Sequence, residues 1–147
     1  MFLVFSQLPG QVPPFADLAA RAARFFASKL ELLKQEENTF EVLLQNHAVD
    51  GTFTLVTRAA TRDDLVWARE AEIRGRAYGM ADLAARCPRV WQLSVSAMRS
   101  PAATAENSAA LTLCAICASV ALGPVLPPDH STLFGVRGAI ERRDGLR

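Results

Sequence analysis

The sequence predicts an α+β fold in which a mostly antiparallel sheet of four or five strands packs against helices. Apolar residues recur at every second position in some segments, as in strands, and at every third or fourth position in others, as in helices. The Asp50-Gly51 dipeptide is favoured in hairpin turns, which indicates that the strands on either side of it are antiparallel. The predicted order β-α-β-β-α-β is compatible with a ferredoxin-like sandwich, and a third apolar helix follows it.

Length and composition indicate one globular domain. The chain has 147 residues, half of them hydrophobic and 21% charged, and we place its core in residues 1–122 and a C-terminal extension in residues 123–147. The formal net charge of +1 lacks the basic excess of most nucleic-acid binders, so we expect no nucleic-acid partner. An odd number of cysteines and no recognisable signal peptide favour a reducing, cytoplasmic location.

The periodicity assigns most of the chain to strands or helices. The predicted strands are Phe2–Phe5, Thr39–Gln45, Gly51–Arg58 and Arg89–Ser96. One predicted helix begins at Phe15, a second spans Thr61–Arg86, and a third follows a candidate N-cap at Thr104 and continues through the apolar run Ala109–Leu122. Phe2–Phe5 is apolar on both faces, which places it inside the sheet. Leu30–Lys34 and Ser131–Ile140 stay undecided between helix and strand. The expected irregular segments are a loop containing Pro101, a proline-rich connector at Pro124–Pro128 and a frayed polar tail at Glu141–Arg147.

Two helices carry recognisable buried faces. The apolar face of the first comprises Phe15, Leu18, Ala19, Ala22 and one of the adjacent pair Phe25 and Phe26. In the second, Thr61 suits the N-cap and Asp64 stands three residues later, in capping-box register. The apolar residues of this second helix that are expected to be buried are Val66, Ile73, Ala77, Met80, Ala84 and Cys87.

Gly75 and Gly79 interrupt the second helix with residues that disfavour helical structure. The interpretation that we prefer is that the helix breaks or kinks between them. The alternative is that the two glycines, four residues apart, let another backbone come close and form a dimer contact. We therefore name Gly75 and Gly79 as candidate interaction residues.

The third helix is almost wholly apolar around its circumference over Ala109–Leu122, and this run is expected to be buried. It is too short to cross a membrane, so we expect no membrane partner, and it packs either in this protein's own core or against a second subunit. Cys114 and Cys117 form a C-x-x-C pattern inside this apolar run. Buried thiols have raised pKa values and are inert, so we expect a packing role for them, and no metal or cofactor.

Few residues are suited to catalysis. The candidates are His47 with the nearby Asp50, and the adjacent Asp129 and His130, because a loop histidine beside a carboxylate can act as a general base. Trp91 fits the buried face of its strand. Trp67 is expected to lie in the core, and it becomes a candidate contact residue if it is exposed.

No serine-hydrolase elbow, dinucleotide fingerprint or phosphate loop occurs in the sequence. We therefore predict a non-catalytic protein-binding module: a regulator, an inhibitor or immunity-type protein, or a subunit of a complex. Its expected partner is another protein or a second copy of itself. The alternative is a small enzyme or ligand-binding protein with a pocket between sheet and helices, served by the two histidine loops.

Overall fold

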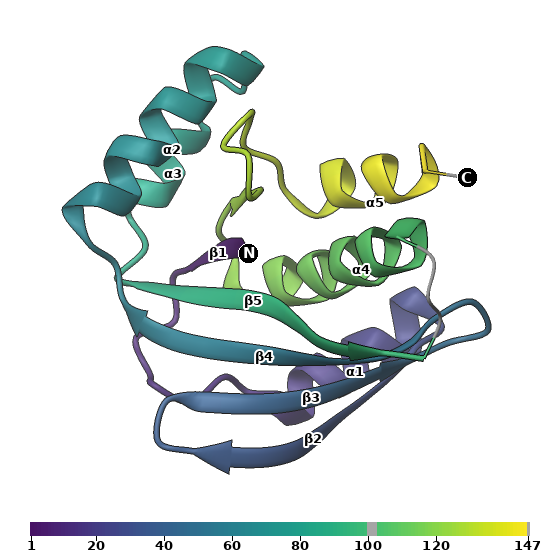
Figure 1. Ribbon diagram of the computed structural model, residues 1–147. Coiled ribbons are helices and arrows are strands. Elements are labelled where there is room, and N and C mark those ends of the chain that lie inside the picture. Colours follow the sequence, from purple (N-terminus) through teal and green to yellow (C-terminus); the bar gives the residue numbers. More distant parts are fainter. Residues whose placement is uncertain (100–102, 147) are drawn as a thin grey trace.

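A computed structural model describes residues 1–99 and 103–146 of the chain (Figure 1). Its elements in order are β1 (Phe2–Ser6), α1 (Phe15–Phe26), β2 (Lys29–Glu36), β3 (Thr39–Gln45), β4 (Asp50–Ala59), α2 (Arg62–Gly75), α3 (Met80–Ala85), β5 (Arg89–Met98), α4 (Ala103–Ala121), β6 (Val125–Leu126) and α5 (Val136–Asp144). The α+β class and the antiparallel sheet are confirmed, and Leu30–Lys34 is part of a strand. The predicted Pro101 loop lies outside the described residues.

The described strands form one sheet in the order β2-β3-β4-β5-β1-β6, and every neighbouring pair is antiparallel. This arrangement differs from a ferredoxin-like sandwich, in which helices connect parallel strands. Here α2 and α3 leave β4 and return to its direct neighbour β5 at the same end of the sheet. The amide of Ala60, between β4 and α2, donates to the carbonyl of Pro88, between α3 and β5, at 2.9 Å. This hydrogen bond joins the segments through which the chain leaves and re-enters the sheet.

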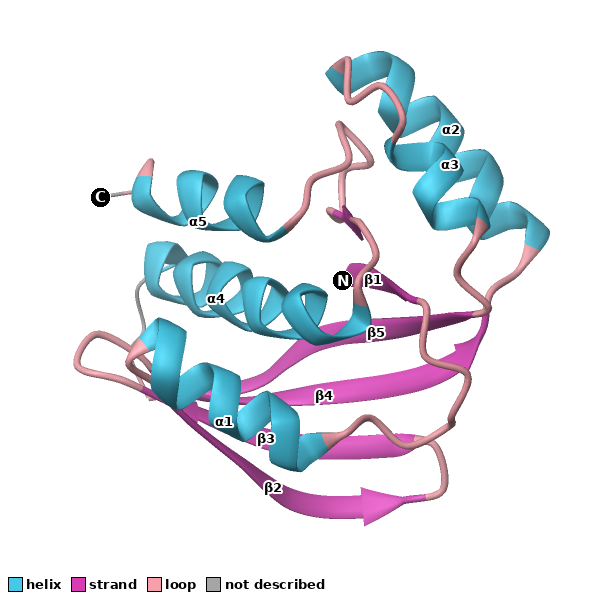
Figure 2. Cartoon of the chain, turned by 180° about the vertical axis from the view of Figure 1, so that it is seen from behind, coloured by secondary structure: helices cyan, strands magenta, loops and turns pink. Residues whose placement is uncertain are grey.

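Helices α1 and α4 cover one face of the sheet, and α5 packs on the outer side of α4 (Figure 2). Alternate residues of β3, β4 and β5 are buried on this face, namely Phe40, Val42, Leu44, Phe53, Leu55, Trp91 and Leu93. Val95, which follows Trp91 and Leu93 in the alternation of β5 and was expected on their face, is 38% exposed. Residues 109–118 of α4 are all buried as well. The third helix is therefore buried within this protein's own core, as the first of the two alternatives predicted.

Helices α2 and α3 cover the opposite face where β1, β5 and β6 lie. They pack small side chains, notably Ala68, Ala71, Ala81 and Ala84, against a surface that includes Leu3, Phe5, Val90 and Leu126. Val4 faces the core that α1 and α4 cover, while Leu3 and Phe5 face the core that α2 and α3 cover, so β1 is buried on both sides. The predicted interior position of this strand is confirmed.

The C-terminal part of the chain is more regular than predicted. The proline-rich connector contains β6, whose Val125 and Leu126 pair with β1. The polar tail was predicted wrongly, because Glu141–Asp144 belongs to α5, which docks on α4 through the buried Ala139. Both elements depend on contacts with distant parts of the chain and have little local sequence signal.

The long predicted helix breaks into α2 and α3, as preferred. Arg76 adopts a left-handed conformation at the end of α2, and Gly79, with a φ of 92°, precedes α3. The predicted buried stripe was wrong in α2, since Val66 and Ile73 are 44% and 71% exposed. The buried face instead carries Asp64, Ala68 and Ala71, because only small apolar side chains let this helix lie close to the sheet.

The start of α2 is anchored by a buried carboxylate. Asp64 is fully buried, and its two oxygens accept from Nη1 and Nη2 of Arg58 at 2.6 and 2.7 Å. Thr61 and Asp64 also form the predicted capping box, with the Thr61 amide 2.7 Å from Oδ2 of Asp64. Gln92, with its amide oxygen turned toward the arginine, accepts from Nε of Arg58 at 2.7 Å. This network fixes α2 to β4 and β5.

None of the described helices combines the length and the apolarity that crossing a bilayer requires.

Candidate functional site

The predicted catalytic residues occupy two separate loops. His47 lies in the loop between β3 and β4, which runs beside the start of α4 (Figure 1). The side chain of Asn46 holds this loop, since its Oδ1 accepts from the amides of Ala48 and Val49, both at 2.8 Å. Asp50 begins β4, and its carboxylate forms an ion pair with the guanidinium of Arg99 at 3.2 Å.

Asp129 and His130 lie in the loop after β6, next to α2 (Figure 1). Hydrogen bonds from Ser131 lower the pKa of Asp129. The imidazole of His130 lies against the indole of Trp67, with ring centroids 5.2 Å apart. The two histidines therefore lie in different loops and do not form one site.

The candidate interaction residues lie on or beside α2. Trp67 is 37% exposed and contacts His130, so its predicted burial in the core was wrong. Gly75 allows a close approach within the chain, because an added Cβ would lie 2.8 Å from the Cα of Thr132. An added Cβ at Gly79 would meet nothing within 4 Å, and this glycine serves the left-handed turn before α3.

The cysteines are deeply buried. Burial raises the pKa of Cys117 to about 12 and that of Cys114 well above its usual range, and it raises the pKa of Cys87 to about 11. Cys114 and Cys117 are surrounded by the apolar core, where a thiolate would be strongly disfavoured. Across residues 1–99 and 103–146, no three His, Cys, Asp or Glu side chains are grouped to hold a metal ion.

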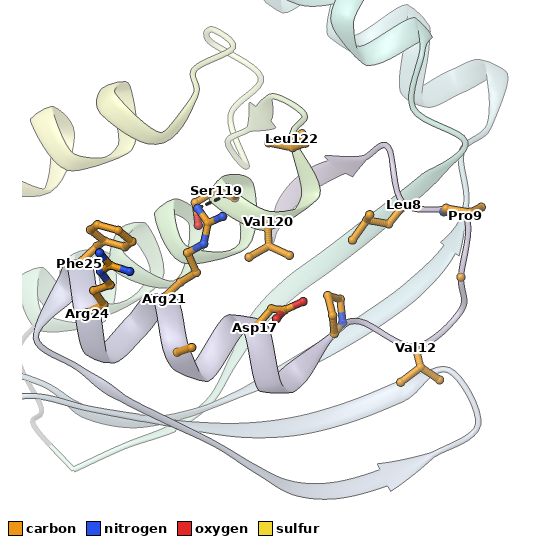
Figure 3. A pocket seen from close by; sticks show the side chains of 13 residues that line it. Leu8, Pro9, Val12, Asp17, Arg21, Arg24, Phe25, Ser119, Val120 and Leu122 are labelled. Atoms are coloured by element: carbon orange, nitrogen blue, oxygen red, sulfur yellow. Dashed lines mark hydrogen bonds between the residues drawn. The ribbon is translucent and has the colours of Figure 1, made fainter.

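A groove of about 670 Å³ lies between α1, the end of α4 and the loop that joins β1 to α1 (Figure 3). The α1 helix contributes Asp17, Ala20, Arg21, Arg24 and Phe25; the loop contributes Leu8, Pro9, Gly10, Val12 and Pro14; and the end of α4 contributes Ser119, Val120 and the following Leu122. Most of this lining is apolar, and Val120 points from α4 toward α1 in Figure 3.

Three large apolar side chains of the groove are exposed to solvent. Val12, Phe25 and Leu122 are 52%, 62% and 59% exposed, although each comes from a different segment. Figure 3 shows them at three separate edges of the groove. Side chains of this kind are usually buried, and exposed apolar side chains that line one groove favour an interaction surface. The sequence held one signal for this site. Adjacent helical residues point about 100° apart, so Phe25 and Phe26 could not both face the core.

Charged groups on α1 border the apolar lining. Arg21 crosses the groove and its Nη1 donates to the Ser119 carbonyl at 3.4 Å (Figure 3). The guanidinium of Arg24 lies over the ring of Phe25, 5.2 Å from its centroid. Within the described part of the chain, Asp17, Arg21 and Arg24 have no ion-pair partner. Because no ion pair neutralises them there, these charges can attract opposite charges on a molecule that enters the groove.

Comparison of the chain with protein-family models, curated proteins and solved structures finds no match. The chemistry of the molecule itself is therefore the basis for a functional proposal.

Proposed function

We propose that this protein is a non-catalytic protein-binding module whose groove between α1 and α4 receives an apolar segment of a protein partner. The observation that carries the proposal is that three exposed apolar side chains, Val12, Phe25 and Leu122, line one groove. A regulator, an inhibitor or immunity-type protein, and a subunit of a complex would all use such a surface.

The chemistry of the groove favours a peptide segment with both apolar and acidic residues. Grooves between secondary-structure elements bind partner helices through apolar side chains spaced along one face. The guanidinium groups of Arg21 and Arg24 lie beside the apolar lining and would attract carboxylates that flank the apolar residues of the partner. Asp17 lies on the same helix, closer to its start, and would favour a basic residue there.

Phe25 is the side chain whose loss should matter most. Burying a phenylalanine side chain contributes about 1.5–3 kcal/mol, and aromatic side chains are frequent hot spots of protein interfaces. Replacing Phe25 with aspartate should therefore weaken partner binding by about tenfold or more, since 1.4 kcal/mol corresponds to a factor of ten. The fold should be unaffected, because most of the Phe25 side chain is exposed to solvent and does not pack in the core.

The test compares two aspartate variants by native mass spectrometry of the tagged protein, isolated gently from its own host. Phe25→Asp should lose a partner that the wild type retains. The matched control is Leu33→Asp, because Leu33 is also exposed but lies on β2, outside the groove. His47→Ala and His130→Ala should also retain the partner. Equal retention by Phe25→Asp and Leu33→Asp, both with wild-type circular dichroism spectra, would contradict the proposal.

A further inference from the structure

The outer face of α2 carries an apolar stripe between two rows of opposite charge. Val66 and Ile73 form the stripe, seven residues apart. On a helix, residues seven apart lie nearly above one another, so three parallel rows run along this face. The basic row comprises Arg62 and Arg69, and the acidic row on the other side of the stripe comprises Asp63 and Glu70.

This face is solvent-exposed and largely without partners. The buried face of α2, with Asp64, Ala68 and Ala71, lies on the opposite side of the helix. Among the residues that the structure describes, the charged side chains of the two rows form a single ion pair, between Glu70 and Arg74, with a long N–O distance of 3.9 Å. Exposed Ile73 and Val66 thus lie between charges that this chain leaves largely uncompensated.

We infer that this face of α2 binds the same face of a second copy of the chain, with the two α2 helices parallel about a two-fold axis. A two-fold interface brings the same patch of both subunits together. In a parallel pair, the stripes meet in the middle and the basic row of each helix faces the acidic row of the other. In an antiparallel pair, each row would face its own copy, and like charges would repel.

The surroundings of α2 are compatible with this arrangement. The helix stands at the edge of the molecule, away from the strands β2 and β3 (Figure 1). The buried face of α2 is opposite its outer face. When the outer faces of two α2 helices pack together, the rest of each subunit therefore lies on the side of its helix that points away from the other subunit. Asp64 and Arg58 fix the start of α2 to the sheet, so the charge rows are presented in one orientation.

The contact is small, so a weak, concentration-dependent dimer is expected rather than a permanent one. It is separate from the groove between α1 and α4, and the two proposals can fail independently. Arg69 and Glu70 are the members of the two rows nearest the middle of α2, and they face one another across the parallel pair.

The experiment uses charge reversal at these two positions and sedimentation velocity of the full chain over a range of concentrations, up to millimolar. Each single variant, Arg69→Glu or Glu70→Arg, turns two symmetry-related attractions into repulsions. Association should therefore fall by about tenfold or more. Mixing the two single variants should restore it, because the glutamates of one chain then face the arginines of the other. The double variant R69E/E70R should self-associate like the wild type.

The control is Arg137→Glu, because Arg137 is an exposed arginine on α5, far from α2 in sequence, and it pairs with Glu141. This variant should dimerise like the wild type. Two results would overturn the inference: a wild type that stays monomeric at the highest concentration, or single variants that associate as well as or better than the wild type. Wild-type circular dichroism spectra of the variants exclude misfolding as the cause.

Discussion

Replacing Asp64 with asparagine is expected to destabilise the fold by about 3 kcal/mol, because a buried ion pair loses one of its members. The carboxylate accepts two hydrogen bonds from Arg58, at 2.6 and 2.7 Å, and one from the Thr61 amide. The asparagine side chain has almost the same size and keeps one oxygen for the Thr61 amide. The substitution therefore removes the charge and leaves the helix cap largely intact.

The magnitude follows from the burial of the two partners. Removing one member of a buried pair costs about 3–5 kcal/mol, since the remaining charge is left uncompensated. The Arg58 side chain keeps 26% of its surface exposed, so water can partly solvate the guanidinium, and the lower end of this range applies. At roughly 2–4 °C per kcal/mol for a chain of this size, the melting temperature should fall by about 6–12 °C.

The assay is urea unfolding followed by circular dichroism at low protein concentration. Asp63→Asn is the matched control, because Asp63 is the preceding residue in the same helical turn and is exposed. Its effect should stay within about 0.5 kcal/mol. If Asp64→Asn and Asp63→Asn changed the free energy of unfolding equally, the buried pair would not be anchoring α2 as described.

The effect of Asp64 should depend on pH in a defined direction. Burial alone would raise the pKa of Asp64, but hydrogen bonds from Arg58 and Thr61 outweigh burial and hold this pKa below its ordinary value. A carboxylate with a lowered folded-state pKa stabilises the protein above the unfolded-state value of about 3.9, and the stabilisation is lost as the pH falls through the folded-state pKa. The free-energy gap between wild type and Asp64→Asn should be constant near neutrality and shrink in acid. A constant gap down to strongly acidic pH would contradict this.

Two further substitutions or treatments test the packing. Gly75→Ala should lower the free energy of unfolding by about 1–3 kcal/mol, because the added methyl group overlaps Thr132 and this strain outweighs the better helix propensity of alanine; a stabilised variant in urea unfolding would refute the close approach. Cys114 and Cys117 should resist alkylation in the folded protein and react after unfolding, because both thiols are buried and their pKa values are raised. Mass spectrometry of the alkylated protein checks this, and rapid labelling of the folded chain would show that the core around α4 opens.

The strands were the most predictable part of the fold, because their pattern is local. The predicted Thr39–Gln45 coincides with β3, whose alternate residues Phe40, Val42 and Leu44 are buried. β6 has only two residues and exists through its pairing with β1, so no local pattern marks it. Likewise, α5 is rich in charge and becomes ordered by packing against α4, a contact that the sequence alone does not reveal.

The error at α2 has a specific cause. Periodicity identifies the side of a helix that carries the larger apolar residues, and this side was assumed to be buried. In α2 the larger residues Val66 and Ile73 face solvent, while Ala68 and Ala71 face the sheet. A close approach between helix and sheet selects small side chains, and hydrophobicity alone does not identify them as the buried face.

The groove could not be predicted from the sequence, because its lining combines the N-terminal residues 8–25 with residues at the end of α4. Phe25 and Leu122 are nearly a hundred residues apart in sequence, and Leu122 was expected to be buried with the rest of its helix. Only the adjacency of Phe25 and Phe26 indicated that one of the two rings would face outward. Of the histidine loops, which the sequence did single out, the one with His130 lies apart from the groove, whereas His47 lines a neighbouring hollow that shares Arg24 and Phe25 with it.

The groove proposal is tested most directly by photo-crosslinking in the host cell. A photo-reactive phenylalanine analogue placed at Phe25 should form a covalent adduct with one discrete protein, while the same analogue at the exposed Leu33 should not form that adduct. Peptide mapping of the adduct should identify an apolar segment flanked by acidic residues. If Phe25 gave no adduct, or gave the same adducts as Leu33, the groove between α1 and α4 would not be the site at which this protein binds its partner.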